Sequence, residues 1–160
     1  MPTPAEEELI RKAIPYRYFR HAGPVRSLEQ AAAERGQQPE QVVRSLLFRI
    51  TEEQFVLVLA AGPEQIDWRL LRRYLGENRL TTATTDEVHQ KTGYVPGAVS
   101  PFGLPAPIRT LVDERVFQPE EISLGSGERG STLIMKSADL KRALPPFETI
   151  QLFPPAERPK

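Results

Sequence analysis

Hydrophobic positions along the chain change their spacing several times, which predicts helices and strands in turn. The clearest strand signal is a pair of apolar runs over residues 42–51 and 55–61, and the polar residues 52–54 between them predict a hairpin. Further strands are predicted over residues 16–21, 79–83, 108–113, 121–124, 132–136 and 149–153. Because strands outnumber helices and come in consecutive pairs, we expect an α+β fold, with a mixed, curved sheet or open barrel flanked by helices.

Capping residues delimit five predicted helices between these strands. The predicted helix starts are at Thr3, Ser27, Asp67, Thr85 and Ser137. The predicted stops of the first four helices are Pro15, Gly36, Gly76 and Gly93. Residues 93–107 follow as a loop rich in Gly and Pro, and loops longer than about 12 residues without regular structure are uncommon in small domains. We therefore expect this loop to have a function.

The length of 160 residues and the hydrophobic content of 39% predict a single domain with its own core. We expect this domain to extend over residues 1–153. Residues 154–160 contain three prolines, and we predict a disordered tail there.

The charge balance is neutral, with 21 basic and 21 acidic residues. The chain therefore lacks the strongly basic balance of proteins that bind nucleic acid mainly through phosphates, and any contact with RNA should be local. Candidate basic patches are Arg69, Arg72 and Arg73, then Arg17, Arg20 and Arg26, and finally Lys141 and Arg142. Each patch fits an ordinary solvated surface at least as well.

The start of the chain and its lack of cysteine bear on compartment and chemistry. Residues 1–12 contain three glutamates where a secretory leader would be basic, and no stretch approaches the roughly 18 apolar residues of a membrane span. The absence of cysteine excludes disulfides, thiol catalysis and thiolate metal sites. These features predict a cytoplasmic protein that does not enter a membrane, with a monomer as the default.

The two histidines, His21 and His89, offer little for metal or acyl-enzyme chemistry. They are far apart in the sequence, and no nearby carboxylate spacing resembles a metal-ligand set, so we predict no metal site. Neither has a sequence partner that marks a catalytic triad. We interpret His89 as a surface residue, while His21 either packs structurally or borders a substrate cleft.

Residues 125–130 read Gly-Ser-Gly-Glu-Arg-Gly, which matches the dinucleotide-binding fingerprint. That motif binds a pyrophosphate only where the glycine turn opens a helix, and here the strand-like residues 131–135 follow. We therefore predict a tight hairpin and no nucleotide cofactor. The hairpin also offers a wall for a pocket, with Gly127 as its candidate binding residue.

The loop over residues 92–103 reads Thr-Gly-Tyr-Val-Pro-Gly-Ala-Val-Ser-Pro-Phe-Gly. Its glycines let backbone N–H groups approach a ligand closely, and its prolines stiffen the chain. Such a loop either presents a row of donors to a carbonyl oxygen, as an oxyanion cradle, or is simply a rigid surface loop. The candidate residues are Gly93, Pro96, Gly97, Ser100, Pro101, Phe102 and Gly103.

The pattern Thr-Gly-Tyr-x-x-Gly-x-x-Ser-Pro-x-Gly resembles the central signature of the YbaK/ProX family of aminoacyl-tRNA deacylases, which are similar to the editing domain of prolyl-tRNA synthetase. The likeness continues in the strand over residues 42–50, in residues 112–114 and in residues 125–140, so it covers roughly residues 15–153. The resemblance implies a YbaK/ProX-like fold and cofactor-free hydrolysis of the ester between a mischarged amino acid and the terminal ribose of tRNA. It also implies a backbone contact between Gly97 and the substrate, with Ser100 and its neighbours shaping the same wall.

Arg44 is a departure from the family pattern. The functional lysine of the family, on a strand that reads Val-Val-Lys-Thr-Leu, aligns with Arg44 in Val-Val-Arg-Ser-Leu. Strand alternation places Arg44 on the face of Leu46 and Phe48, toward the interior or a cavity mouth. Arginine keeps the charge and can clamp a phosphate or carboxylate, but it does not deprotonate. Arg44 therefore either contacts substrate or holds the end of the strand.

The sequence thus supports two functions of different kinds. The first is a trans-acting deacylase that binds the acceptor end of mischarged aminoacyl-tRNA. The second, suggested by Arg44, is a non-catalytic module that binds the same aminoacyl or tRNA group without turnover. An accessory role in complex with an aminoacyl-tRNA synthetase is a third possibility.

Overall fold

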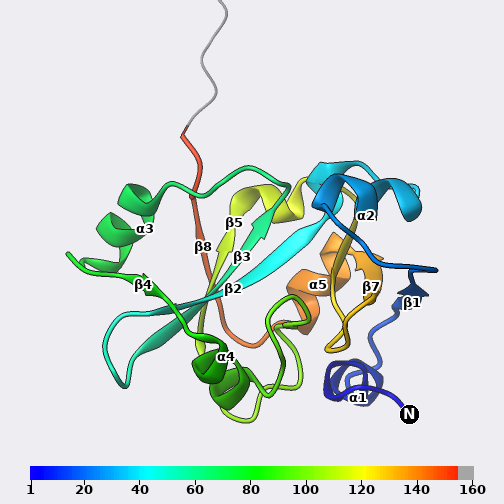
Figure 1. Ribbon diagram of the computed structural model, residues 1–160, viewed down its shortest axis with the longest axis horizontal. Helices are drawn as coiled ribbons and strands as arrows, with labels where there is room; N and C mark the ends of the chain where they lie inside the picture. Colours follow the sequence, from blue (N-terminus) through cyan, green and yellow to red (C-terminus); the bar gives the residue numbers. More distant parts are fainter. Residues whose placement is uncertain (155–160) are drawn as a thin grey trace, which may run out of the picture.

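The computed structural model describes residues 1–154, so the predicted tail lies, apart from Pro154, outside the described residues. The described chain forms two sheets with five α-helices around them (Figure 1). The five-stranded sheet has the order β4-β2-β3-β5-β8, with β4 (Thr81–Thr82), β2 (Val43–Arg49), β3 (Phe55–Ala61), β5 (Arg109–Asp113) and β8 (Glu148–Ile150). The three-stranded sheet has the order β1-β7-β6, with β1 (Arg17–Arg20), β7 (Ser131–Lys136) and β6 (Glu121–Gly125).

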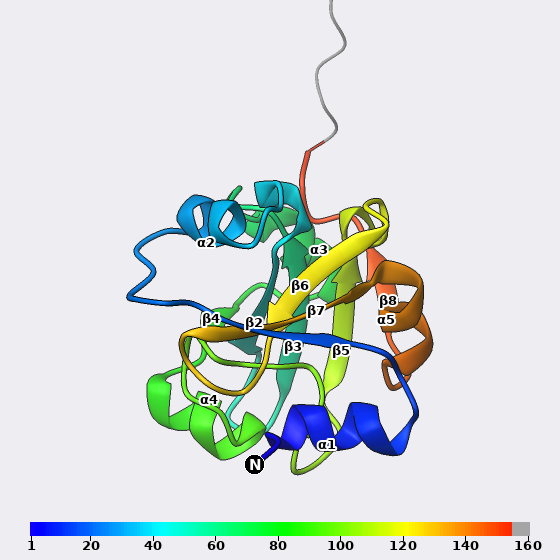
Figure 2. The same ribbon diagram turned by 90° about the vertical axis from the view of Figure 1, so that its right-hand side faces the viewer.

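The two sheets do not close into a barrel, which settles the expected α+β architecture in favour of two open sheets. Figure 2 shows the smaller sheet crossing in front of β2, β3 and β5. The two sheets are joined by an isolated parallel bridge between Val42 and Ser123. On its outer edge, β2 pairs with β4 only at Phe48 and Arg49, so the edge between residues 43 and 47 is left without a neighbouring strand among the described residues.

The alternating pattern of β2 places it between two hydrophobic clusters. Val43 and Leu47 face the larger cluster, which lies between the sheets. Phe48 and the half-buried Leu46 face the smaller cluster, which includes Leu71 of α3. The predicted hairpin is confirmed, because β2 and β3 pair antiparallel from Val43 with Ala61 to Arg49 with Phe55.

The helices are α1 (Pro4–Arg11), α2 (Leu28–Glu34), α3 (Trp68–Leu75), α4 (Thr85–Thr92) and α5 (Ser137–Ala143), and short 3-10 turns cover Pro39–Gln41 and Glu114–Phe117. The predicted caps Thr3, Ser27 and Asp67 each accept a hydrogen bond from the first helical turn. These three starts are confirmed.

Several predicted boundaries are wrong by a residue or more, including the end of α1 at Arg11, where a stop at Pro15 was predicted, and β4, which covers Thr81–Thr82 and not residues 79–83. The cap of α4 is Thr84, whose hydroxyl accepts from the Glu87 N–H, and not Thr85. Ser137 is the first helical residue of α5, and its hydroxyl donates to the Pro119 carbonyl, so it does not cap the helix. The last strand covers Glu148–Ile150, earlier than the predicted residues 149–153. In each case neighbouring polar residues offer similar local signals, and tertiary contacts select one of them.

No helix in residues 1–154 has both the length and the apolar character that are needed to cross a membrane.

Candidate functional site at the free edge of strand β2

Arg44 and Gly97 meet where three neighbouring hollows come together beside the free edge of β2. The hollows have volumes of about 400, 340 and 670 Å³, and both residues line all three. We call them the apolar chamber, the central cavity and the outer groove. The two residues that the sequence singled out as catalytic candidates are therefore brought together, although 53 positions separate them in the chain.

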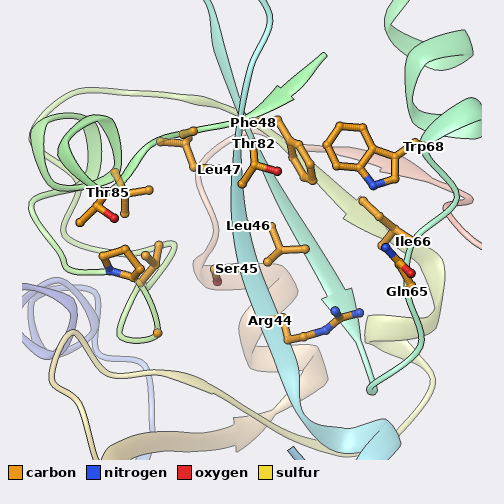
Figure 3. A pocket seen from close by; sticks show the side chains of 15 residues that line it. Arg44, Ser45, Leu46, Leu47, Phe48, Gln65, Ile66, Trp68, Thr82 and Thr85 are labelled. Carbon is orange, nitrogen blue, oxygen red and sulfur yellow. The ribbon is translucent and has the colours of Figure 1, made fainter. Parts of the chain in front are cut away.

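The apolar chamber is the hollow of about 400 Å³ on the side of α3 (Figure 3). Its apolar lining includes Leu46, Leu47, Phe48, Ile66, Trp68, Ala83, Val88 and Val99. The rings of Phe48 and Trp68 pack edge to face with centroids 5.0 Å apart, which fixes both side chains in the wall. The mainly apolar lining of this chamber suits an apolar group, and its volume lies within the range of small-molecule pockets.

The central cavity, of about 340 Å³, lies between β2 and the hairpin of β6 and β7. Its polar lining residues are Arg35, Arg44, Ser45, Ser131 and Thr132, and Gly97 and Gly125 contribute backbone. None of its lining residues, within the described part of the chain, is Asp, Glu, His or Lys. The cavity therefore carries positive charge and hydroxyl groups without a titratable base.

The outer groove, of about 670 Å³, continues from the central cavity along α2. It is lined by residues 23–28, by His21 and by four arginines, which are Arg26, Arg35, Arg44 and Arg129. No carboxylate side chain is among its described lining residues. Arg129 also donates to the Pro96 carbonyl at 3.2 and 3.3 Å, so it ties the hairpin to the loop that carries Gly97.

Arg44 is half-buried on the same strand face as Leu46, as its position in the alternation predicts (Figure 3). One Nη donates to the Glu64 carbonyl at 2.6 Å, while Nε is buried and has no partner within residues 1–154. Burial lowers the pKa of the Arg44 guanidinium because the charged form loses hydration. The structure thus holds one edge of Arg44 in place and leaves its Nε buried and unpaired within residues 1–154.

Gly97 has a φ of +87°, a conformation that side chains other than hydrogen disfavour. The turn is closed by the Ala98 N–H, which donates to the Val95 carbonyl at 3.0 Å. Among the described residues the Gly97 N–H has no hydrogen-bond partner, and space is open where a Cβ would lie. Gly97 is therefore a loop position at the junction whose backbone donor is unpaired within residues 1–154.

The other candidate glycines of the loop are used differently, so they do not contribute to the row of donors that the oxyanion-cradle alternative describes. The Gly93 N–H donates to the His89 carbonyl at 2.8 Å and ends α4. The Gly103 N–H donates to a Glu8 carboxylate oxygen at 3.0 Å. Both amides are thus committed to the scaffold, because the loop needs anchors at its two ends.

Three further candidates, Ser100, Pro101 and Phe102, are buried and do not line the three hollows. The Ser100 hydroxyl accepts from the Phe102 N–H at 3.3 Å, and Phe102 lies in the larger hydrophobic cluster. Pro96 does line the apolar chamber beside Gly97. Of the loop candidates, Pro96 and Gly97 are the two that the structure places at the junction.

Tyr94, between these two groups of residues, holds the loop in shape. Its buried hydroxyl donates to the Phe102 carbonyl at 2.6 Å, and burial raises the pKa of the Tyr94 hydroxyl. A Cβ on Gly127 would overlap the Tyr94 ring, so Gly127 packs against the loop and does not line the hollows. The hairpin residue that does line the central cavity is Gly125, where a Cβ would overlap the Val99 carbonyl.

His21 is buried and lines the outer groove, so it combines the two roles that the sequence left open. Its Nε2 lies 3.2 Å from an Arg35 Nη, and its Nδ1 lies 2.8 Å from a Glu34 carboxylate oxygen. Because a guanidinium only donates, Nε2 accepts and Nδ1 donates to Glu34. The Glu34 contact with His21 lowers the pKa of that carboxyl.

Most lining residues of the three hollows were not predicted from the sequence, among them Arg35, Ser45, Trp68 and Arg129. Ser45 was detectable as the neighbour of Arg44 on a strand whose outer edge is free. Arg35 lies in a segment without a local motif, and Arg129 lies in the glycine hairpin of residues 125–130. Only the fold brings the two side chains to the outer groove.

The predicted hairpin over residues 125–130 is confirmed, because it joins the antiparallel strands β6 and β7 and opens no helix. No cluster of three or more His, Cys, Asp or Glu side chains suited to a metal ion occurs in the described part of the chain.

A family model for the aminoacyl-tRNA editing domain matches residues 22–143. The chain belongs to the aminoacyl-tRNA editing domain family. The match spans β2, the Gly97 loop and the β6–β7 hairpin, which together surround the junction. The resemblance to YbaK/ProX proteins that the loop motif suggested is thereby confirmed.

Proteins similar to this editing domain include two bacterial proline–tRNA ligases. The enzyme of Aquifex aeolicus is 27% identical over 128 residues, which cover 80% of this chain and 22% of the ligase. The enzyme of Streptococcus pneumoniae is 30% identical over 126 residues, which cover 79% of this chain and 19% of the ligase. The chain thus spans about a fifth of the length of these relatives.

Two solved structures share the fold over almost their whole length. One, described as a candidate trans-editing enzyme for prolyl-tRNA synthetase, has a TM-score of 0.84 at 24% identity and covers 94% of this chain and 95% of its own. Another, described only as a hypothetical protein, has a TM-score of 0.81 at 22% identity, with coverage of 92% and 98%.

Proposed function

We propose that this editing domain acts in trans to hydrolyse the ester bond between a mischarged amino acid and the terminal ribose of tRNA. The observation that carries the proposal is the junction at Arg44 and Gly97, where an apolar chamber meets a cavity and groove lined by arginines and free of carboxylates. An aminoacyl-tRNA end has the same division, with an amino-acid side chain on one side of an ester and an RNA backbone on the other.

The proposed binding mode places the amino-acid side chain in the apolar chamber, where burial of apolar surface stabilises it. The 3′ end of the RNA lies in the central cavity and the outer groove, beside Arg35, Arg44 and Arg129. The ester carbonyl then falls at the junction, next to the free N–H of Gly97. The same backbone donor is the one that the family resemblance assigns to substrate contact.

The reaction requires an oxygen nucleophile to attack the ester carbonyl carbon. A new C–O bond forms to water, the C–O bond to the ribose breaks, and the ribose oxygen leaves with a proton. The Gly97 N–H stabilises the oxyanion of the tetrahedral intermediate, a contribution that reaches about 10²–10³ in rate for a well-placed donor. Because no Asp, Glu, His or Lys among the described residues lines the chamber or the cavity, we assign the proton transfer to water or to the neighbouring ribose hydroxyl.

The same lack of a base favours a second function, in which the domain binds aminoacyl-tRNA and does not hydrolyse it. Arg44 stands where the family has a lysine, and a guanidinium is wider and stays protonated. Under this alternative, the hollows bind the same aminoacyl-tRNA end, and the domain does not hydrolyse its ester.

Release of amino acid from a panel of mischarged tRNAs tests the two functions. The first substrate to test is mischarged proline tRNA, because similar sequences lie within proline–tRNA ligases. We expect wild-type protein to hydrolyse at least one mischarged tRNA above the buffer rate and Arg44→Gln to lower the rate at least about tenfold. Arg79→Gln is the matched control, because Arg79 is exposed and belongs to none of the candidate basic patches.

Three outcomes separate the alternatives. No hydrolysis by wild type at micromolar protein overturns the deacylase proposal. Tight binding without hydrolysis, together with turnover gained by Arg44→Lys, supports the binding module. Stable complex formation with prolyl-tRNA synthetase supports an accessory role. We expect the proposed activity to operate in the cytoplasm, where aminoacyl-tRNA is made, and from a monomer.

A further inference from the structure

We propose that Arg129 is a positioning residue for the backbone donor of the loop, because it holds the peptide between Pro96 and Gly97 from the carbonyl side. The N–H of this peptide is the group that the proposed function places beside the ester carbonyl. The catalytic consequence therefore rests on the proposed function, whereas the contact itself is a feature of the fold. The inference also gives the hairpin of residues 125–130 a role, which is to present Arg129 to the loop.

The contact joins the guanidinium of Arg129 to the peptide unit that contains the Gly97 N–H. Arg129 Nε and Nη2 donate to the Pro96 carbonyl oxygen at 3.3 and 3.2 Å. Every peptide bond among residues 1–154 is trans, so the carbonyl and the N–H of one peptide point in opposite directions. Two donors on the carbonyl therefore fix the direction of the N–H. Their positive charge also polarises the peptide and strengthens its N–H as a donor.

The turn that contains this peptide does not fix the peptide's orientation by itself. The Ala98 N–H donates to the Val95 carbonyl at 3.0 Å and closes a four-residue turn. Pro96 at its second position and the φ of +87° at Gly97 define a type II turn. A type I turn closes with the same hydrogen bond, and proline and glycine fit it as well, but its central peptide is rotated by roughly half a turn. That rotation would carry the Pro96 carbonyl away from Arg129, so the contact selects the observed orientation.

The position of Arg129 indicates which way the Gly97 N–H points. Arg129 lines the outer groove alone, whereas Gly97 lines the outer groove, the central cavity and the apolar chamber. Because the N–H points away from the carbonyl and its donors, we place it on the side of the chamber and the cavity. This amide has no partner within residues 1–154, and Gly97 is exposed, so a ligand can reach it.

Two glycines of the hairpin bring it close enough to the loop for this contact. A Cβ on Gly125 would overlap the Val99 carbonyl, and a Cβ on Gly127 would overlap the Tyr94 ring. The hairpin thus lies directly against the loop on both sides of the turn. A side chain at either glycine would push the hairpin outward and lengthen the contact.

The backbone that carries Arg129 is itself fixed on both sides. The buried Ser126 hydroxyl accepts from the Glu128 N–H at 3.1 Å. The His21 N–H donates to the Gly130 carbonyl at 2.8 Å. The exposed side chain of Arg129 therefore starts from a preset position, and it loses less conformational freedom in reaching the loop.

Solution NMR of the full chain, labelled with ¹⁵N and ¹³C, tests the contact independently of catalysis. We expect a strong nuclear Overhauser effect between the Pro96 Hα and the Gly97 N–H, because these hydrogens lie close together in a type II turn but not in a type I turn. Arg129→Gln should move the Pro96 carbonyl ¹³C and the Gly97 amide ¹⁵N signals upfield, since the carbonyl loses a cationic donor. Arg79→Gln is the charge-matched control and should leave both signals in place. A weak effect in the wild type, or unchanged signals in Arg129→Gln, overturns the proposal.

The kinetics of hydrolysis separate positioning from a direct contact with RNA. Arg129→Gln should lower kcat for a mischarged tRNA at least about threefold, and by a larger factor than it raises KM, because a misdirected donor stabilises the transition state less well. Arg129→Lys keeps the charge and one donor, so it should restore part of kcat. A raised KM with unchanged kcat in Arg129→Gln, fully restored by lysine, would show that Arg129 only contacts RNA and would overturn the positioning role.

A double-mutant cycle tests whether Arg129 acts through Gly97. Gly97→Ala disfavours the positive φ next to the same peptide. The double variant with Arg129→Gln should therefore lose less kcat than the product of the two single losses. Losses that multiply would give the two residues independent roles and contradict the proposal.

The outcomes for Arg129 and for the proposed activity are distinguishable. If the wild type hydrolyses no mischarged tRNA but Arg129→Gln shifts the signals of the Pro96 and Gly97 peptide, the deacylase is rejected and the held peptide is retained. If the wild type hydrolyses mischarged tRNA and Arg129→Gln keeps its kcat, the deacylase is retained and the positioning role is rejected.

Discussion

The two halves of the loop over residues 93–107 are built from the same residue types and serve different purposes. In the first half, Pro96 and Gly97 reach the junction of the three hollows, and the Gly97 N–H is without a partner in the described chain. In the second half, Phe102 and Gly103 turn inward, where Gly103 is fixed by Glu8 of α1. A Gly/Pro signature thus combines positions that line the hollows with several positions that hold the loop in place.

This difference follows from what surrounds each glycine. Space is open where a Cβ of Gly97 would lie, whereas a Cβ on Gly103 would fall on the backbone of Pro4 and on the Tyr94 hydroxyl. Both residues have positive φ, at +87° and +70°. The same backbone requirement is therefore joined to open space at one position and to close packing at the other.

The strongest test of this contrast is Gly103→Ala, which should destabilise the fold by about 3 kcal/mol, from the disfavoured φ together with the overlap at Pro4. Urea unfolding followed by circular dichroism measures the change. Gly36→Ala is the control, because Gly36 has a φ of +71° and no atom within 4 Å of its added Cβ, so it reports the backbone cost alone. Equal losses for the two variants would show that packing at Gly103 is unimportant.

Tyr94→Phe should destabilise the fold by about 2 kcal/mol, because it leaves the buried Phe102 carbonyl without its donor. The tyrosine also makes stability depend on pH. The pKa of the Tyr94 hydroxyl is raised in the folded state. Its contribution to the free energy of unfolding is therefore complete below the unfolded value of 10.0 and is lost as the pH rises from there through the folded pKa. Between pH 8 and 11, the free energy of unfolding should therefore fall less steeply with pH in Tyr94→Phe than in the wild type. The same slope in both proteins would contradict this account.

Gly97→Ala should cost only about 1 kcal/mol of stability, the backbone term that Gly36→Ala also reports. Its rate of aminoacyl-tRNA hydrolysis should nevertheless fall at least about tenfold, because a small displacement of the donor is costly in a preorganised site. Thermal unfolding and single-turnover hydrolysis, measured on the same preparations, separate the two effects. If Gly97→Ala lowers the unfolding temperature strongly and keeps the wild-type rate of hydrolysis, Gly97 has a structural role and no role in substrate binding.

Glu8→Gln should have the smallest effect, about 0.5 kcal/mol or less, because an amide oxygen still accepts from the Gly103 N–H and only the pair with Lys12 is lost. Glu8→Ala removes the acceptor and should cost about 1 kcal/mol. Urea unfolding of the two variants checks the order. If both variants lose the same free energy of unfolding, Glu8 stabilises the fold through its ion pair with Lys12 and not through its hydrogen bond from the Gly103 N–H.

The order of elements was predictable because each depends on neighbours in the sequence. The β2–β3 hairpin follows from two apolar runs and the polar turn between them, and the starts of α1 and α3 follow from Thr3 and Asp67. The boundaries at Thr84 and Ser137 were less predictable, since adjacent threonines or a strand-to-helix junction give competing local signals. Arg44 was placed on the correct face of β2 by alternation alone.

By itself, the sequence determined the α+β class and the family and singled out Arg44 and Gly97 as candidate site residues, because strand period, capping and the loop motif are local properties of the chain. Only the tertiary structure decided that Gly97 and not Gly103 has a free amide, and that Arg35 and Ser45 join Arg44 around one cavity. These features arise from contacts between residues far apart in the chain. The direction of a hydrogen bond and the space beside a glycine are set by whichever segment packs there, and the local pattern does not encode that segment.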